Sequence, residues 1–170
     1  LYKLYTDHSY EPMPENSKTA SIAVYIEGIG TINNETDSFY SKVTGRGETG
    51  VVARVEQSPA KILEQLRLFQ QENPGAIVEK IEFDIFGFSR GAAAARHFAN
   101  EVLKGEHSLV ATALSVGSPA SSEFNWRLKT DNTINFIGLF DTVAAIANPG
   151  LFDFTGTNSR NPGVNLKLPD

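Results

Sequence analysis

The sequence predicts an α/β fold in which a mostly parallel sheet is flanked by helices. Three apolar, β-branched segments favour strands: residues 20–27, the run that ends at Gly87, and residues 133–140. Helical patterns separate these segments, so the order along the chain is strand, helix, strand, helix, strand. Strands joined through helices run parallel, with right-handed connections. We expect helices to cover both sides of residues 133–140, which are apolar on both faces.

Capping residues mark the helix between the first two predicted strands. Ser58 suits the N-cap and Pro59 suits the first turn, while Asn73-Pro74-Gly75 is a stop signal. Residues 51–57 could be helical too, with a break or kink before Pro59. The expected buried face consists of Ile62, Leu63, Leu66 and Phe69.

Two connecting segments carry weaker signals. Residues 33–50 are polar and rich in glycine, which predicts a loop. Within it, Gly45-Arg46-Gly47 lacks the remaining residues of a phosphate-binding or dinucleotide-binding motif. Residues 109–116 fit a strand or a short helix, and Gly117-Ser118-Pro119 fits a turn.

The second predicted strand runs directly into Gly87-Phe88-Ser89-Arg90-Gly91, and an alanine-rich helical pattern starts at once. This is the G-x-S-x-G nucleophile elbow in the strand-to-helix context that it requires. A sharp turn of this kind brings the flanking backbones too close for a Cβ at Gly87 or Gly91. It also raises the Ser89 hydroxyl above the sheet edge and directs the first helical N–H groups toward a developing oxyanion. A glycine-rich turn with an incidental serine is the alternative.

The helix after the elbow, expected to end near Gly105, has two distinct faces. Small and apolar residues share one face at helical period, which lets the helix lie close to the sheet. These residues are Gly91, Ala92, Ala95, Phe98, Ala99, Val102 and Leu103. The opposite, polar face consists of Arg96, His97, Asn100, Glu101 and Lys104.

Ligands of open parallel sheets bind outside the carboxyl ends of the strands. Residues 28–31, Ser89 and Asp141 each follow a predicted strand and therefore meet at that edge. The order serine then aspartate matches the Ser…Asp…His order of α/β-hydrolases, so Asp141 is the candidate that orients a histidine. A cap on the segment after the strand is the alternative for Asp141. Asp153 is the reserve candidate, and Asp84 comes too early, inside the strand.

The glycine-containing loop at residues 28–31 is a candidate oxyanion donor. In α/β-hydrolases one donor comes from an early strand-to-helix loop, and another is the N–H of the residue after the nucleophile. The backbone N–H groups of Gly28, Ile29 and Arg90 are the corresponding candidates in this chain. A simple turn that needs positive φ explains the glycines of this loop equally well.

The histidine of the triad is the missing member. It should follow Asp141, yet no histidine follows His107. His8 precedes the predicted core strands and suits a surface turn, and His97 lies on the polar helix face, directed away from Ser89. His107 begins a loop before Asp141 and is the alternative, because that loop could bring it to Ser89. We therefore expect the catalytic histidine to lie beyond Asp170, outside residues 1–170.

Composition narrows the remaining function classes. The chain has 170 residues, 41% hydrophobic and 21% charged, which suits one globular domain over residues 1–170. A net charge of −5 argues against a nucleic-acid surface. The chain has no cysteine, which excludes disulfides and thiolate sites, and no cluster of ligands suggests a metal or other cofactor. No apolar run is long enough to span a membrane, and no signal peptide is visible. The ends of the chain suggest a fragment of a longer protein.

Three segments resemble the catalytic domain of type VI secretion phospholipase effectors. They are G-F-S-R-G-A-A-A-A-R-H-F-A-N at 87–100, F-I-G-L-F-D-T-V at 136–143 and V-Y-I-E-G-I-G-T at 24–31. The resemblance spans residues 20–145 and implies an α/β-hydrolase with Ser89 as nucleophile and Asp141 as the triad acid. Two family features, an F-D-G-T motif and a downstream histidine, are absent from residues 1–170.

The same resemblance implies a biological setting. Such effectors are injected by bacteria into the periplasm of rival cells, where they cut membrane phospholipids. A cognate immunity protein and a component of the secretion apparatus are the implied partners. Two alternatives stay open on the sequence alone: a soluble carboxylesterase or thioesterase, and a hydrolase-fold module without activity that binds lipid or protein.

Overall fold

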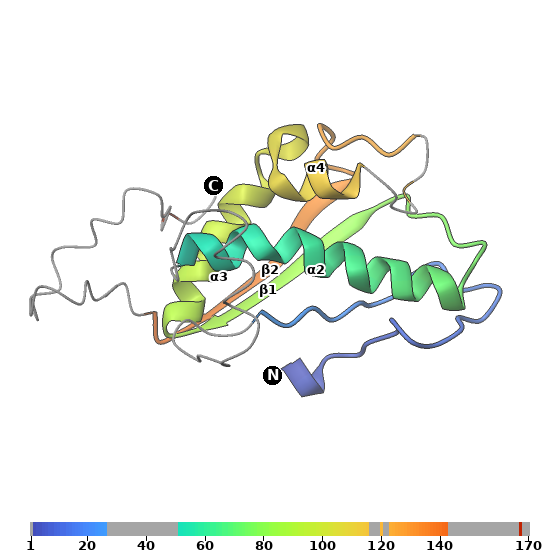
Figure 1. Cartoon of the computed structure of the whole chain (residues 1–170), viewed down its shortest axis with the longest axis horizontal. Helices are drawn as coiled ribbons and strands as arrows, with labels where there is room; N and C mark the ends of the chain where they lie inside the picture. Colours follow the sequence, from blue (N-terminus) through green and yellow to red (C-terminus); the bar gives the residue numbers. More distant parts are fainter. Residues whose placement is uncertain (1, 27–50, 116–119, 121–122, 143–166, 168–170) are drawn as a thin grey trace, which may run out of the picture. The chain divides into compact units, whose positions relative to one another are not determined.

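The computed structural model describes residues 2–26, 51–115, 120, 123–142 and 167, and every structural statement concerns these residues. Two strands and three α-helices form along the described chain, with two 3₁₀ turns (Figure 1). In order they are η1 (Tyr2–Leu4), α2 (Val51–Glu72), β1 (Ile81–Phe88), α3 (Arg90–Val102), η2 (Gly105–His107), α4 (Leu109–Leu114) and β2 (Asn132–Phe140). The segment 109–116, left open between strand and helix, begins with helix α4.

The chain divides into two compact units. The first contains residues 1–26, 57–83 and 101–135, and the second contains residues 27–56, 84–100 and 136–170. Helices α2 and α3 and strands β1 and β2 each continue across one of these boundaries. Both Ser89 and Asp141 belong to the second unit, which is therefore the unit that carries the candidate site.

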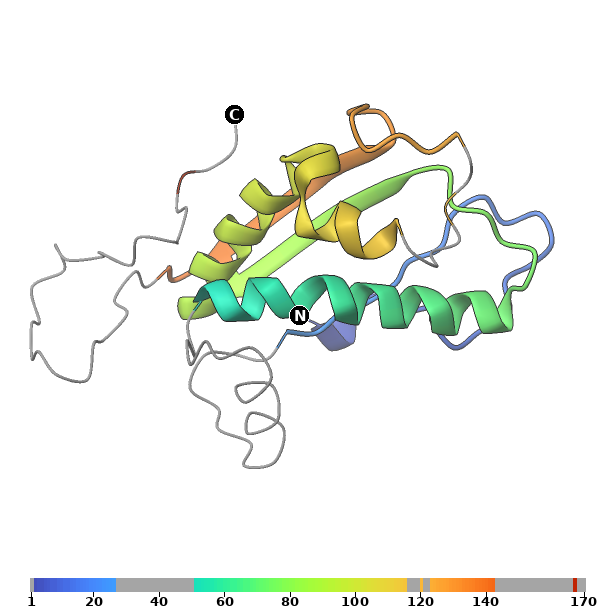
Figure 2. The same ribbon diagram turned by 45° about the horizontal axis from the view of Figure 1, so that its top comes forward.

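Strands β1 and β2 pair as a two-stranded parallel sheet (Figures 1 and 2). At the start of the pair the Ile81 N–H donates to the Asp131 carbonyl at 2.7 Å, and at its end the Ser89 N–H donates to the Phe140 carbonyl at 2.9 Å. The two donors, Ile81 and Ser89, are eight residues apart, and the two acceptors, Asp131 and Phe140, are nine residues apart, so the segment with β2 contains one extra residue. The predicted parallel pairing of these two strands is confirmed.

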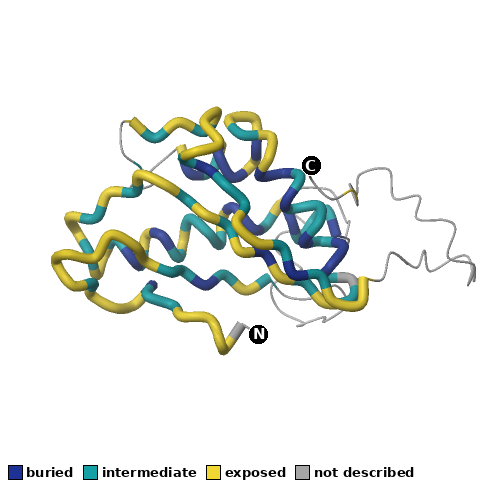
Figure 3. The backbone as a smooth tube through the Cα atoms, turned by 180° about the vertical axis from the view of Figure 1, so that it is seen from behind, coloured by how far each residue is buried: buried dark blue, intermediate teal, exposed yellow. Residues whose placement is uncertain are grey.

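Burial alternates along β1, which shows that only one face of this strand is packed (Figure 3). Ile85 is buried, whereas Asp84, Phe86 and Phe88 are exposed. On β2 the Phe136 and Phe140 side chains are also about half exposed. The expectation that both faces of residues 133–140 are covered is therefore wrong for the part of the chain that the structure describes.

Helix α3 buries the alanine-rich face that its sequence predicts. Ala92, Ala95, Ala99 and Val102 are at most 5% exposed. Leu103 departs from the prediction, since it lies beyond the helix and is 47% exposed.

Glu101 also departs from the prediction, because it is buried although it was expected on the polar face. One of its carboxylate oxygens accepts a hydrogen bond from the N–H of Leu109 at 2.8 Å, and the other pairs with Lys104. Glu101 thus caps the first residue of α4, where a negative charge is favourable. Its burial follows from this role, which periodicity within α3 could not reveal.

Helix α2 is one continuous helix that passes through Pro59. The predicted start at Ser58 is wrong, and the alternative, helical residues 51–57, is right without the expected break. Val51, Val55 and Ser58 are all buried and recur at helical spacing, as do Leu66 and Phe69 further along. Burial of this stripe offsets the cost of an internal proline. The helix ends at the predicted stop signal.

Residues 20–26 form no strand, contrary to the prediction. Side chains from the preceding turn hold this segment instead of a neighbouring strand. The Asp7 carboxylate accepts hydrogen bonds from the Ser9 hydroxyl at 2.5 Å and from the Ala23 N–H at 3.2 Å. Two hydrogen bonds join His8 to Ser21. The backbone N–H of His8 donates to the Ser21 carbonyl, and the imidazole Nδ1 of His8 accepts from the Ser21 N–H.

These contacts make the attachment of residues 20–26 sensitive to acid. Burial of Asp7 alone would raise its pKa, but the hydrogen bonds from Ser9 and Ala23 outweigh it and hold the pKa below its usual range. A lowered pKa stabilises the folded state at pH values above the pKa of the unfolded chain, which is about 4. This stabilisation is lost as the pH falls through the pKa of the folded state.

We therefore expect Asp7→Asn to lower the free energy of unfolding by roughly 1 kcal/mol at pH 7, a small effect because the carboxylate is only partly buried. The difference from the wild type should shrink below pH 4, as the pH falls toward the lowered folded-state pKa and Asp7 becomes protonated in the folded protein as well. Denaturant unfolding at pH 7 and pH 3, with amide exchange at Ala23 as the local readout, measures it. A difference that stays constant between the two pH values would contradict this account.

Candidate active site

Ser89 occupies the single position between the end of β1 at Phe88 and the start of α3 at Arg90. Its φ is +55°, in the left-handed region that residues with a side chain rarely adopt. Such a conformation costs on the order of 1–3 kcal/mol and persists where the surrounding structure enforces it. A strained serine between a strand and a helix is the backbone geometry that a nucleophile elbow requires.

The tightness of this turn explains the glycine at position 87. A Cβ placed on Gly87 would lie 2.2 Å from the Gly91 carbonyl oxygen and 2.6 Å from the Ala92 Cα. A Cβ placed on Gly91 would meet nothing within 4 Å among the described residues, apart from the backbone of its own helix. The steric need for glycine thus lies at Gly87, and the structure gives no such need at Gly91, contrary to the expectation.

The two glycines therefore predict opposite outcomes for the same substitution. Gly87→Ala should unfold or severely destabilise the elbow, because the methyl group would overlap backbone atoms that cannot rotate away. Gly91→Ala is the matched control and should change the melting temperature little. Thermal unfolding of both purified variants measures the difference, and equal stability would show that the turn is looser than described.

Asp141 directly follows β2 and shares the unusual backbone of Ser89. Its φ is +48° and its side chain is exposed. The Ser89 N–H donates to the carbonyl of Phe140, the residue before Asp141, at 2.9 Å. One hydrogen bond therefore joins the candidate nucleophile to the strand end that carries the candidate acid.

The start of α3 offers N–H groups beside Ser89. The N–H of Ala92 is taken by the Ser89 carbonyl at 3.0 Å, which closes the first turn. The N–H groups of Arg90 and Gly91 belong to the same first turn, where a helix leaves donors without helical partners. With the helix dipole they suit an anionic oxygen near Ser89. The other oxyanion candidates, Gly28 and Ile29, lie outside the described residues, as does the reserve aspartate Asp153.

The three histidines lie in other surroundings. His8 belongs to the first unit, where its Nδ1 accepts the Ser21 N–H at 2.9 Å. His107 also belongs to the first unit, with its Nε2 at 3.4 Å from Glu106 and its side chain largely exposed. His97 lies seven residues after Arg90 on α3, roughly 10 Å along the helix axis. The base of the triad stays a prediction outside residues 1–170.

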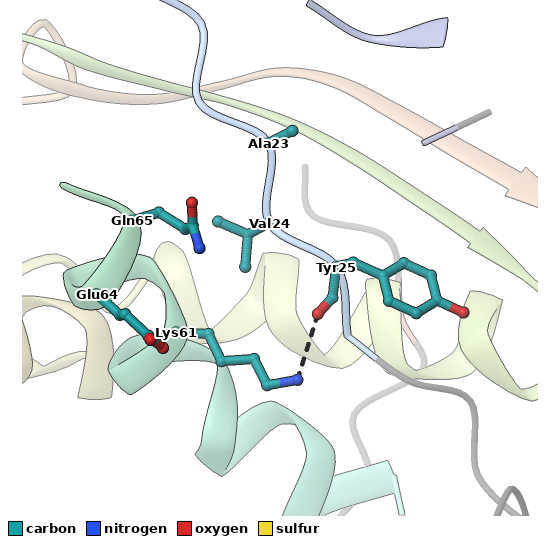
Figure 4. A pocket seen from close by; sticks show the side chains of 6 residues that line it. All are labelled: Ala23, Val24, Tyr25, Lys61, Glu64 and Gln65. Carbon is teal, nitrogen blue, oxygen red and sulfur yellow. Dashed lines mark hydrogen bonds between the residues drawn. The ribbon is translucent and has the colours of Figure 1, made fainter. Parts of the chain in front are cut away.

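Other features of the described residues carry no chemistry of this kind. They contain no cluster of acidic and histidine side chains suited to a metal ion, and none of their helices is both long and apolar enough to cross a bilayer. A shallow cavity of about 210 Å³ lies in the first unit, between residues 23–25 and α2 (Figure 4). The Lys61 Nζ donates there to the Tyr25 carbonyl at 3.4 Å.

Comparison with known proteins adds one solved structure. No protein-family model and no curated protein matches the chain. The chain is similar to the Tle1 effector in a structure of that effector bound to the VgrG spike of the type VI secretion system, with 36% sequence identity and a TM-score of 0.64. The match covers 94% of this chain and 29% of the effector chain, so this chain spans less than a third of that effector. The similarity supports a relationship with type VI secretion effectors of the Tle type.

Proposed function

We propose that this chain carries the nucleophile and the triad acid of a serine-dependent lipid ester hydrolase, a phospholipase that acts as an antibacterial type VI effector. The observation that supports the proposal most is Ser89, held at positive φ between a strand and a helix. The similarity to the Tle1 effector supports the type VI effector part of the proposal. The proposed α/β-hydrolase fold rests on the parallel pair β1–β2 and on the same similarity.

In the proposed reaction the Ser89 Oγ attacks the carbonyl carbon of the ester. Its proton passes to a histidine, which Asp141 keeps in the correct tautomer and orientation. The N–H groups at the start of α3, first that of Arg90, stabilise the oxyanion, with Gly28 and Ile29 as the other proposed donors. The alcohol leaves with the proton from the histidine, and water then releases the fatty acid from acyl-Ser89.

The histidine in this scheme comes from outside residues 1–170. His8 and His107 have local partners in the first unit, and His97 lies two turns along α3. A serine hydroxyl without a base is a weak nucleophile. Residues 1–170 alone are therefore proposed to turn over little ester, and the intact protein is the form in which activity should be measured.

The experiment that tests the proposal compares two substrates with the intact protein. Phospholipid vesicles should release fatty acid, detected by mass spectrometry, whereas soluble short-chain esters should be poor substrates. Hydrolysis of soluble esters alone would support the carboxylesterase alternative. Vesicle binding without hydrolysis of either substrate would support the binding-module alternative and contradict the proposal.

The proposed partners follow from the similarity rather than from the described residues. The Tle1 effector was solved bound to the VgrG spike, and we propose a spike component as the partner of this protein as well. A cognate immunity protein, which would cover the mouth of the site near residues 28–31 and Ser89, and delivery into the periplasm of a target cell complete the proposal. Periplasmic expression of the intact protein should be toxic, and co-expression of the immunity protein should relieve it.

A further inference from the structure

A phenylalanine ring lies across a glycine at the candidate site's end of the sheet. A Cβ placed on Gly138 would lie 2.8 Å from the Phe86 Cδ1 and 3.0 Å from the Phe136 Cε1. The rings of Phe86 and Phe136 contact each other, with centroids 5.4 Å apart and planes inclined by 41°. Gly138 is buried, although Phe136 and Phe140, two residues before and two residues after it on β2, are exposed. The absence of a side chain at Gly138 is therefore what makes room for the Phe86 ring.

This contact lies close to the bond that joins the two strand ends. Phe86 is three residues before Ser89 on one strand, and Gly138 is three residues before Asp141 on the other. Between them and the site, the Ser89 N–H donates to the Phe140 carbonyl. After that bond both chains enter the left-handed region, at Ser89 and Asp141. Any shift of β2 against β1 at this contact would change the distance between the Ser89 and Asp141 side chains.

We propose that Gly138 and Phe86 are positioning residues that set the spacing between Ser89 and Asp141. The effect on catalysis rests on the proposed function, whereas the effect on the spacing of the strand ends rests on the contact alone. A ring over a cross-strand glycine adds a side-chain contact to a parallel pair, whose hydrogen bonds alone hold somewhat less strongly than those of antiparallel strands. Phe86 is 38% exposed, so more than half of its surface is covered by other residues.

Disturbing this contact should lower the turnover number more than it lowers the stability of the fold. A methyl group at position 138 would displace a ring that can rotate, so the fold should survive. The ring would then no longer hold the strand ends together. A displacement of about 1 Å between catalytic groups can lower the rate on the order of 100-fold.

The first experiment measures kinetics of the intact protein on phospholipid vesicles. Gly138→Ala should lower kcat about 10- to 100-fold and leave KM within about twofold. Gly75→Ala is the matched control, because a Cβ there meets nothing within 4 Å, and it should behave as wild type. In a Phe86→Leu background, Gly138→Ala should lower kcat less than about threefold, since the ring that it displaces is gone. An unchanged kcat for Gly138→Ala, or an equal loss in both backgrounds, would overturn the inference.

The second experiment does not depend on activity, so it separates this inference from the proposed function. Residues 1–170 contain no cysteine, which allows the pair Ser89→Cys and Asp141→Cys to report the spacing of the strand ends in the intact protein. Peptide mass spectrometry follows disulfide formation between the two positions under mild oxidation. Gly138→Ala should slow this disulfide at least fivefold. Equal rates with and without Gly138→Ala, or no disulfide in the parent pair, would overturn the inference even if the intact protein is an active hydrolase.

Discussion

Ser89→Ala is expected to lower hydrolysis of phospholipid by the intact protein about 10⁶-fold, the size of effect known for the loss of a serine nucleophile. The reaction requires an oxygen that can form the acyl intermediate, and no neighbouring group at the turn replaces it. The substitution removes one hydroxyl from a half-buried side chain, so the fold should be retained. Initial rates on vesicles, with circular dichroism and melting temperature as the folding control, measure the effect.

The residual activity of this variant is informative. Alanine tolerates the left-handed backbone of position 89 no better than serine does, so a small change of melting temperature is acceptable. A folded Ser89→Ala protein that keeps more than a few per cent of wild-type activity would show that Ser89 is not the nucleophile.

Asp141→Asn should lower kcat about 10⁴-fold, because the histidine would lose its correct tautomer and the charge that stabilises its protonated form. Asparagine is one of the few residues that adopt the left-handed region readily, so it should accept the φ of +48° at this position. The fold should therefore be unchanged. Vesicle hydrolysis at saturating substrate is the measurement.

Asp84→Asn provides the matched control for this substitution. Asp84 lies on β1 in the same unit and is exposed, and no catalytic role is assigned to it. It should retain kcat within about twofold. Normal turnover in Asp141→Asn, with the control equally active, would move the acid role to Asp153 or to another carboxylate.

The strand, turn and helix around Ser89 could be predicted because their signal is local. Gly87, Ser89 and the alanine pattern lie within one short stretch, and the change from strand to helix period is visible inside it. Asp141 could be placed because parallel strands end at the same edge of a sheet. The structure describes both residues at the ends of paired strands, as the fold prediction requires.

The failed predictions depended on contacts outside the local pattern from which each prediction was made. Residues 20–26 have the composition of a strand, but Asp7 and His8 occupy their backbone groups in place of a ladder. Helix α2 continues through Pro59 because buried residues on both sides of the proline stabilise it, which a capping signal cannot show. Glu101 is buried because α4 needs a cap at its first residue, eight positions later.

The role of Gly138 was missed for the same reason. A glycine inside a strand is a signal in itself, since it often marks a close approach by another group. What approaches it here is the Phe86 ring, 52 residues earlier in the chain. Only the register of β1 against β2 brings the two together, and that register follows from the folded sheet.

Covalent labelling tests directly whether Ser89 is the nucleophile. The intact protein would be treated with a serine-reactive phosphonate that carries an alkyl chain, and peptide mass spectrometry would locate the adduct. One adduct is expected, on Ser89, which should be absent from Ser89→Ala and should form in parallel with the loss of vesicle hydrolysis. An adduct on another serine, or full hydrolysis by a protein whose Ser89 is completely labelled, would contradict this role of Ser89.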